Sequence, residues 1–449
     1  MNIDNNDTIA AIATARGEGS IAIIRLSGSL SFQIAEALSK NQNFKPRNAT
    51  LCKLFDLKDG FVIDEAVVIF FKAPHSFTGE DIVEFQVHGG IAVANLVLDN
   101  VLRGGARLAN PGEFSKRAFE LGKIDLTKAE AIAKLISAKS DDAVKLLARQ
   151  LTGELQTFVE QIREDLIFSL ACSEVGIDYA EEDLPDDLTI SIKSRLQNTL
   201  QKLEHTLEVS KRREGMIDGF KVSIVGKPNV GKSSILNSLL SYDRAIVSSI
   251  AGTTRDTIEE SVKIGTHLVK IVDTAGIRDA SDEIEQIGIE RSKQAIEESK
   301  IIIAIFDNSR NCDDEDMKIL DILQNIQDKQ IIYILNKIDL ESRFDNTKLP
   351  DFISLSSKQT IAPLTLKLEK ILDQNAGEDE MTLVSKRQIG CVEETIQNVK
   401  SSSQMLDDGA LELFSHFIKE SIVSISAITR PFDNDQMLDV MFNSFCLGK

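Results

Sequence analysis

The stretch Gly226-Lys-Pro-Asn-Val-Gly-Lys-Ser233 decides the fold of the residues around it. It follows the apolar run 221–225 and precedes a helical pattern, and it fits the form G-x-x-x-x-G-K-[ST]. Glycines let the backbone N–H groups surround phosphates, while the lysine reaches the β- and γ-phosphates and the serine hydroxyl ligates Mg²⁺. The pattern predicts a phosphate-binding loop with contacts at Asn229, Val230, Gly231, Lys232, Ser233 and Ser234.

Three companion motifs follow predicted strands further along the chain. An aspartate after the run 269–272 can hold Mg²⁺ through water, and the glycine of the same motif can donate its N–H to a γ-phosphate. The aspartate of the motif after the run 331–335 can accept hydrogen bonds from guanine N1–H and its amino group, which adenine lacks. A serine-rich motif after the next strand can close over the base. Together the motifs indicate a GTPase, with candidate contacts at Asp273, Thr274, Ala275, Gly276, Asn336, Lys337, Asp339, Ser356, Ser357 and Lys358.

The segment between the first two motifs is a candidate switch region. A threonine hydroxyl there could complete the Mg²⁺ shell and sense the γ-phosphate. The segment adds Ser248, Ser249, Ile250, Ala251, Gly252, Thr253 and Thr254 to the predicted GTP contacts. Ile277 stands where Ras-like GTPases have the water-orienting glutamine, so another group must orient water, and Glu285 is a candidate. Asn229 and switch carbonyls could hold a monovalent cation that supplies positive charge.

Composition divides the chain into four zones. Residues 1–122 carry short β-rich runs and one helical stretch, which predicts an α+β domain. Residues 123–219 and 376–449 are helical in pattern, and residues 220–375 alternate strand and helix, which predicts a mostly parallel sheet. We expect a multidomain protein in which an α/β Ras-like P-loop domain is inserted into an all-α domain. Four independent domains are the alternative, but neither helical zone alone is large enough for a generous core.

The charge and the cysteine content limit the possible binding partners and the cellular compartment of the protein. The 449 residues carry a net charge of −19, which argues against a general nucleic-acid coat but not against a local basic patch such as Lys116-Arg117 or Lys211-Arg212-Arg213. The five cysteines are far apart and form no CxxC pair, so a reducing cytosol is expected. No signal peptide or membrane-spanning run is visible. We therefore expect a soluble, cytoplasmic protein without a membrane partner.

Further motifs, taken together with the GTPase motifs, resemble the MnmE (TrmE) family of tRNA modification GTPases over essentially the whole chain. They are Asp7-Thr-Ile-Ala-Ala-Ile-Ala-Thr14, Ile21–Gly28, Ser76-Phe-Thr-Gly-Glu-Asp81, His88-Gly-Gly90, Pro111-Gly-Glu-Phe114, Arg117-Ala-Phe119, Gly122-Lys-Ile-Asp-Leu126, Ile250–Asp256, Gly288-Ile-Glu-Arg291 and Phe445-Cys-Leu-Gly-Lys449.

The resemblance implies the architecture and the partners. The N-terminal domain would bind a tetrahydrofolate derivative, in the 5-formyl or methylene form, and would also form the homodimer. The partner MnmG (GidA), which carries FAD, would join it in a heterotetramer or larger complex. Together they would add an aminomethyl-type group to C5 of the wobble uridine of certain tRNAs. K⁺ would promote GTP hydrolysis.

The resemblance also assigns roles to individual positions. The implied K⁺ ligands are Asn229, Ser248, Ile250 and Thr253, and the implied Mg²⁺ ligands are Ser233 and Thr254. Glu285 matches the catalytic glutamate, and Cys446 matches the cysteine needed for modification. The folate contacts match Arg25, Glu84, Lys123 and Lys449. Departures include Ser248, where some members have threonine, and Ala15-Arg16, where many members have two prolines.

One alternative function shares every GTPase motif. A ribosome-assembly or signalling switch would bind GTP without modification chemistry, but it would not need the folate-like N-terminal domain or the residues 445–449. A membrane-remodelling GTPase would need a basic amphipathic or anchoring segment, which the sequence lacks. The terminal Cys446-Leu-Gly-Lys449 does not fit a prenylation box, because lysine is not a usual last residue.

Overall fold

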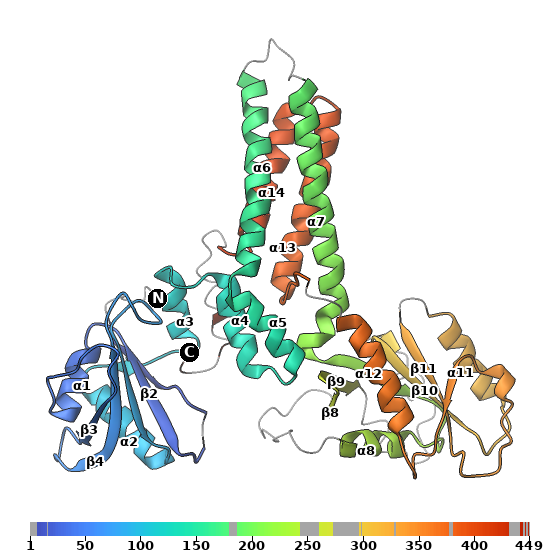
Figure 1. The fold of residues 1–449 in the computed structure, drawn as a ribbon, viewed down its shortest axis with the longest axis horizontal. Coiled ribbons are helices and arrows are strands. Elements are labelled where there is room, and N and C mark those ends of the chain that lie inside the picture. The colour runs from blue at the N-terminus through green and yellow to red at the C-terminus, as the bar shows by residue number, and fades with distance from the viewer. Residues whose placement is uncertain are drawn as a thin grey trace. The chain divides into compact units, whose positions relative to one another are not determined.

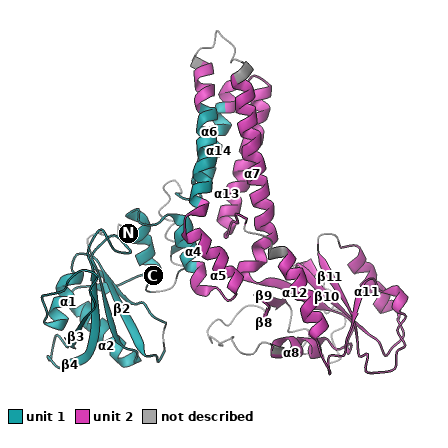
Figure 2. Cartoon of the chain, in the orientation of Figure 1, with its two compact units in different colours: residues 1–133, 156–170, 415–449 teal, residues 134–155, 171–414 magenta. Residues whose placement is uncertain are grey.

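The computed structural model describes residues 7–15, 17–178, 186–242, 260–272, 296–297, 299–326, 329–376, 380–430, 441–442, 445 and 448. The contacts between residues divide the chain into two compact units, which Figure 2 shows in different colours. Unit 1 comprises residues 1–133, 156–170 and 415–449, and unit 2 comprises residues 134–155 and 171–414. The domain boundaries expected at residues 122, 219 and 375 stay predictions.

Unit 1 is built on a six-stranded sheet with the order β3-β4-β5-β2-β1-β6. Neighbouring strands are antiparallel except β1 and β6, which are parallel. Helices α1 and α2 share one hydrophobic core with this sheet (Figure 1). The elements are β1 (Ile9–Ile12), β2 (Ile21–Ser27), α1 (Ser31–Ser39), β3 (Thr50–Phe55), β4 (Val62–Phe71), β5 (Ile82–His88), α2 (Ile91–Arg103) and β6 (Arg107–Leu108).

Alternation along β2 separates the core of unit 1 from its candidate site. Ala22, Ile24 and Leu26 are buried and belong to the core that includes α1 and α2. Because successive side chains of a strand point to opposite faces, Ile23 and Arg25 lie on the other face, where they are partly exposed. Arg25 is therefore presented on the sheet face that α1 and α2 do not cover.

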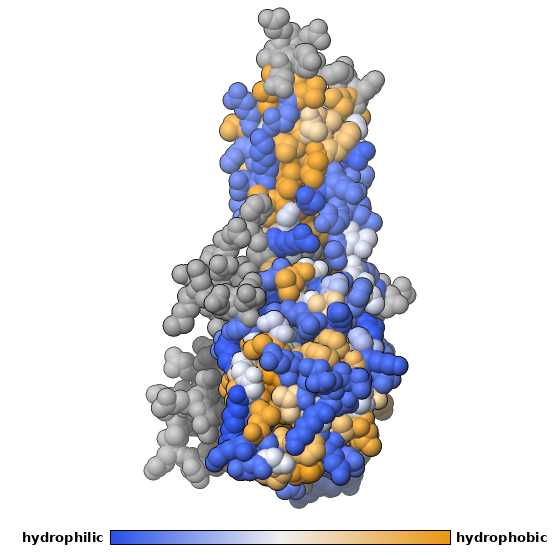
Figure 3. Space-filling model, turned by 90° about the vertical axis from the view of Figure 1, so that its left-hand side faces the viewer, coloured by the Kyte–Doolittle hydropathy of each residue, from blue (hydrophilic) through white to orange (hydrophobic). Residues whose placement is uncertain are grey.

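Unit 1 continues with the helices α3 (Glu113–Glu120) and α4 (Leu126–Ser137) and with segments of α6 (Glu154–Asp178) and α14 (Leu411–Ser426). The backbone N–H of Leu126 donates to the Thr429 carbonyl at 3.1 Å. Phe442 is buried against Leu126 and Ala129. These contacts join the C-terminal residues to the start of α4. Large apolar side chains also reach the surface of unit 1 (Figure 3), among them Ile21, Leu51, Phe61, Val62, Ile167 and Val423.

Unit 2 contains a second six-stranded sheet, with the order β12-β11-β10-β7-β9-β8. Its strands are parallel except for the antiparallel β8–β9 hairpin. Residues of β10, such as Ile302 and Ile303, are fully buried, because two separate hydrophobic clusters cover the sheet. The elements are β7 (Phe220–Val225), α8 (Lys232–Tyr242), β8 (Glu260–Ile264), β9 (His267–Val272), β10 (Ile301–Asp307), α11 (Asp314–Gln324), β11 (Gln330–Asn336), a 3-10 turn (Asn346–Lys348), β12 (Phe352–Ser354) and α12 (Ala362–Ala376).

The remaining helices of unit 2 are α5 (Asp141–Leu151), α7 (Asp186–Asp218) and α13 (Lys386–Asp407). Helices α7 and α13 run antiparallel to each other (Figure 1). Ion pairs such as Lys193–Asp407 and Lys211–Glu393 join them. The chain leaves α7, forms the α/β sheet and returns to α7 through α13. The predicted fold class is thereby confirmed: a mixed N-terminal domain, a helical domain and an inserted α/β P-loop domain. None of the described helices is both long and apolar enough to cross a bilayer.

Candidate functional site

The loop between β7 and α8 has the backbone of a phosphate-binding loop. Asn229 has φ 65°, and Gly226 and Gly231 have φ 150° and 105°. A Cβ on Gly231 would overlap the side-chain amide of Asn336, and a Cβ on Gly226 would lie 2.5 Å from the Ile305 carbonyl oxygen. The two glycines are therefore needed both for their backbone conformation and for their close approach to neighbouring strands.

Lys232 and the serines after it begin helix α8. The Lys232 ammonium donates to the carbonyls of Gly226 and Lys227, at 2.7 and 2.8 Å, so it lies across the curled loop. Burial lowers the pKa of Lys232, because it removes the ammonium from water and so disfavours the charged form. Ser233 and Ser234 are exposed in the first turn, where helix N–H groups favour an anion. This arrangement suits a polyphosphate with its Mg²⁺.

The predicted base-binding motifs meet the phosphate loop. Asn336 is fully buried, donates to the Val230 carbonyl at 2.8 Å and accepts from the Ser357 N–H at 3.0 Å. The Lys337 ammonium lies 2.6 Å from the Asn229 carbonyl oxygen and 2.6 Å from Asp307. Three loops that are far apart in the sequence are thus joined by direct hydrogen bonds. Asn229 itself is exposed.

Asp339 and the serine motif lie at the same edge of the sheet. The Ser356 hydroxyl donates to Asp339 at 2.7 Å, and this hydrogen bond keeps the pKa of Asp339 below its usual range. Asp339 is therefore an ionised acceptor at neutral pH, as recognition of guanine N1–H requires. Lys358 is exposed beside this pair.

Several predicted site residues lie outside the described residues, and their roles stay predictions. They are Ser248, Ser249, Ile250, Ala251, Gly252, Thr253, Thr254, Asp273, Thr274, Ala275, Gly276, Glu285, Cys446 and Lys449.

In unit 1, the sheet brings together two of the predicted folate contacts. Arg25 on β2 is directly opposite Glu84 on β5, and its guanidinium lies 2.8 Å from the Glu84 carboxylate. The guanidinium also lies 5.9 Å from the ring centres of Phe77 and Phe114. Arg25, Glu84 and the Phe77 ring are partly exposed, whereas Phe114 is buried. A cation, a carboxylate and an aromatic ring at one surface fit a ring that carries polar atoms at its edge.

Two further segments approach the same region. The side chain of Lys123 lies over Gly79, so that a Cβ on Gly79 would be 3.0 Å from Lys123 Cε. A Cβ on Gly448 would be 2.6 Å from the Ile12 carbonyl oxygen, which places Gly448 against the end of β1. Ile12 is the residue after Ala11, which is paired with Arg25 on β2.

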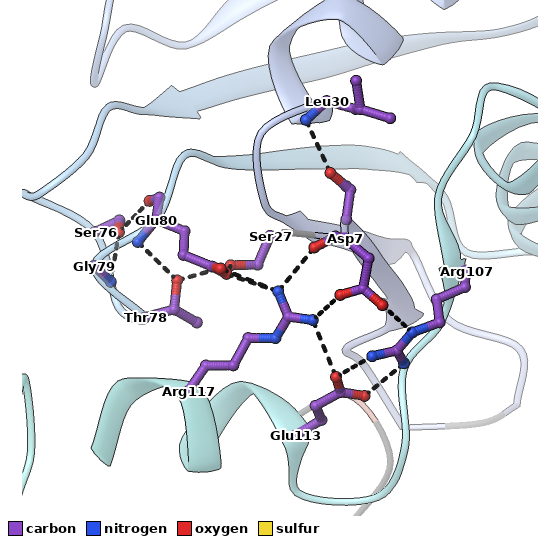
Figure 4. Close-up of polar contacts among 11 residues, drawn as sticks. Asp7, Ser27, Leu30, Ser76, Thr78, Gly79, Glu80, Arg107, Glu113 and Arg117 are labelled. Carbon is purple, nitrogen blue, oxygen red and sulfur yellow. Dashed lines mark hydrogen bonds and ion pairs between the residues drawn. The ribbon is translucent and has the colours of Figure 1, made fainter. Parts of the chain in front are cut away.

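Sequence reasoning missed the burial of one basic residue of this region. Lys116-Arg117 was expected to offer a surface basic group, but the Arg117 side chain is only 4% exposed. It belongs to what we call the α3 charge cluster, consisting of Asp7, Glu80, Arg107, Glu113 and Arg117 (Figure 4). Burial alone would weaken the charge of Arg117, but Glu80, Asp7 and Glu113 outweigh it and raise its pKa. The exposed-patch interpretation is wrong for this residue.

The side chains of the second basic group, Lys211-Arg212-Arg213, also make contacts within the protein. Lys211 pairs with Glu393 on α13, and Arg212 pairs with Glu380. Arg213 is buried and donates to the Glu380 carbonyl and the Thr382 hydroxyl. These side chains therefore join α7 to the segment through which the chain returns from the inserted domain.

Comparison with known proteins finds relatives over the whole chain. A family model described as "GTP-binding protein TrmE N-terminus" matches residues 8–123, and one described as "MnmE helical domain" matches residues 126–446. A protein named tRNA modification GTPase MnmE from Aliarcobacter butzleri (strain RM4018) is 63% identical over 444 residues, covering 99% of each chain. One of the same name from Sulfurimonas denitrificans is 57% identical over 446 residues, covering 99% of this chain and 100% of its own. The chain belongs to the MnmE (TrmE) family of tRNA modification GTPases.

Proposed function

We propose that this protein is a K⁺-dependent GTPase that works with MnmG to modify C5 of the wobble uridine of certain tRNAs, with a tetrahydrofolate as one-carbon donor. The observation that supports the proposal is that one chain contains two candidate binding sites. Unit 2 has loops that fit a guanine nucleotide, and unit 1 has the Arg25–Glu84 pair, with Lys123 over Gly79 and Gly448 beside the end of β1. A simple GTP switch needs only the first of these sites.

In the GTP site, Lys232 and the first turn of α8 would bind the phosphates, and Asp339 would select guanine. Ser233 and Thr254 would hold Mg²⁺, which offsets phosphate charge when bound. Asn229, Ser248, Ile250 and Thr253 would hold K⁺, and the exposure of Asn229 leaves its side-chain oxygen open to a cation. Glu285 would orient the attacking water in place of the missing glutamine.

In the folate site, Arg25, Glu84, Lys123 and Lys449 would bind the cofactor, whose carboxylates and polar ring suit cations and one carboxylate. Cys446 would supply a thiol for the modification step. FAD would lie on MnmG, and this chain would form a homodimer within a heterotetramer or larger complex. The exposed apolar side chains of unit 1 are available for such an interface. The reaction would take place in the cytoplasm.

Mass analysis of wobble uridines tests the proposal directly. Cells that lack the protein should accumulate unmodified wobble uridine, and the wild-type gene should restore the modified form. The Cys446→Ser variant should retain GTP hydrolysis but should not restore the modification. Cys391→Ser, on the described helix α13, is the matched control and should restore it. An unchanged nucleoside pattern in the deletion would favour the alternative of a ribosome-assembly or signalling switch.

A further inference from the structure

The α3 charge cluster joins three segments that are far apart in the sequence. One guanidinium nitrogen of Arg117 donates to the Asp7 carbonyl and to Glu80, both at 3.0 Å. The other donates to the Asp7 carboxylate at 2.6 Å and to Glu113 at 3.1 Å. Figure 4 shows these contacts converging on Arg117 from the start of β1, from the loop before β5 and from α3 itself.

Glu80 extends the cluster into the loop of residues 76–81. Its carboxylate accepts from the Ser27 hydroxyl at 2.6 Å, and its backbone N–H donates to the Thr78 hydroxyl at 3.1 Å. The Ser76 hydroxyl donates to the Glu80 carbonyl at 2.5 Å and accepts from the Gly79 N–H at 2.9 Å. The conformation of this loop therefore depends on the position of Glu80, which Arg117 holds.

The same loop and the same helix also contact the proposed folate-binding residues. The loop places Gly79 under Lys123 and Phe77 beside Arg25. Helix α3 places Phe114, the neighbour of Glu113, beside Arg25. Among the described residues, the side chain of Arg117 forms no hydrogen bond or ion pair with Arg25 or Lys123, but it fixes both elements on which their positions depend.

We propose that Arg117 is a positioning residue for the folate site, acting through the loop of residues 76–81 and helix α3. The inference rests on the proposed folate function and extends it to a residue that has no role in it so far. The planar fork of arginine donates to three partners at fixed angles, and a lysine ammonium cannot reproduce that geometry. Arg117→Lys keeps the charge of the cluster while loosening the loop under Lys123.

A double-mutant cycle on the full-length protein tests this role, with 5-formyltetrahydrofolate as the probe in titration calorimetry. We expect Lys123→Ala to weaken binding about tenfold in the wild type, and by less than about threefold in the Arg117→Lys background. The two changes are non-additive because Lys123 is no longer held in place once Arg117 is replaced. Thermal melting first verifies that each variant is folded at the assay temperature.

Merely structural destabilisation would leave the contribution of Lys123 intact, so additive effects would overturn the inference. If Arg117→Lys does not fold, Glu80→Gln replaces it in the cycle, because the amide retains the shape but not the charge. Glu120→Gln, on the same helix but outside the cluster, is the matched control and should leave the effect of Lys123→Ala unchanged. A wild type that binds no folate would instead remove the proposed folate function, and this inference with it.

Discussion

Asp339 is the residue on which base selection in the proposed GTP site depends. Replacing it with asparagine would turn the proposed acceptor for guanine N1–H and the amino group into a mixed donor and acceptor. We expect Asp339→Asn to weaken GTP binding by about a hundredfold or more and to favour xanthosine triphosphate, whose C2 oxygen accepts the new N–H. Competition of GTP and of xanthosine triphosphate against a fluorescent nucleotide measures the two affinities. Asp345→Asn, a nearby carboxylate that caps the 3-10 turn, should leave the preference for GTP unchanged.

Glu285 carries the second prediction for a single residue. Glu285→Ala should bind GTP normally but hydrolyse it about 10²-fold or more slowly, because no group then orients the water. Single-turnover phosphate release in K⁺ buffer is the measurement. Glu283→Ala, two residues away, is the control and should hydrolyse at the wild-type rate. Hydrolysis by Glu285→Ala at the wild-type rate would show that Glu285 has no role in the mechanism. Equal rates of GTP hydrolysis by the wild type in K⁺ and in Na⁺ buffer would show that K⁺ has no specific role.

Residues in local motifs could be predicted, and residues whose role comes from distant contacts could not. The phosphate loop and Asn336–Asp339 have fixed spacings within a few residues, and the structure places both as expected at the ends of strands. Arg117 follows a lysine on a short helix, and this local pattern is typical of an exposed basic residue. Its burial depends on Asp7 and Glu80, which are 110 and 37 residues away, and no local pattern reports such partners.

At the scale of elements, the N-terminus of α5 meets the β8–β9 hairpin through carboxylates. Asp142 accepts from the Thr266 hydroxyl at 2.5 Å and lies 3.3 Å from a ring nitrogen of the buried His267. Asp141 pairs with Lys263 at 3.2 Å. Both carboxylates lie in the first turn of the helix, where the helix dipole favours negative charge. Since β9 ends directly before Asp273, this contact fixes the strand that leads into a predicted GTP motif.

Asp142→Ala should therefore lower the free energy of unfolding of the protein by about 1–3 kcal/mol, because the partly buried Thr266 hydroxyl loses its acceptor and the buried His267 ring loses a neighbouring carboxylate. Urea denaturation followed by circular dichroism measures the change. Lys145→Ala removes an exposed partner of the same carboxylate and should cost less than about 1 kcal/mol. Equal stability of the two variants would show that the contact does not hold the hairpin.

Elements with continuous apolar runs were the easiest to predict. The runs 301–306 and 331–335 correspond to β10 and β11, which are central strands covered on both faces. The edge strand β8 was not predicted, because Glu260–Ile264 alternates polar and apolar residues and has no long apolar run. Its pairing with β9 depends on the tight connection through Gly265, whose φ is 59°.

At the scale of the whole molecule, the net charge of −19 and the buried ion pairs have opposite effects on acid stability. Protonation of surface carboxylates reduces repulsion, so the acidic surface alone would favour the folded state as the pH falls. Carboxylates whose pKa is lowered in the folded state act the other way. Burial would raise the pKa of Glu113, but hydrogen bonds from Arg107 and from the Asn110 N–H outweigh burial and keep the pKa below its ordinary value of 4.5.

The pH dependence of a single variant separates these two effects, because the surface background is common to both proteins. A carboxylate with a lowered folded-state pKa stabilises the fold fully above its unfolded pKa, and that contribution is lost as the pH falls. Glu113→Gln should therefore cost about 2–4 kcal/mol of unfolding free energy at pH 7 and progressively less as the pH falls through the lowered pKa of Glu113, where the wild type also loses the charge. Urea denaturation at each pH gives the difference.

Glu120→Gln, on the exposed side of α3, should differ from wild type by less than about 0.5 kcal/mol throughout. A cost for Glu113→Gln that does not change with pH would mean that packing, and not charge, holds α3 to the start of β1.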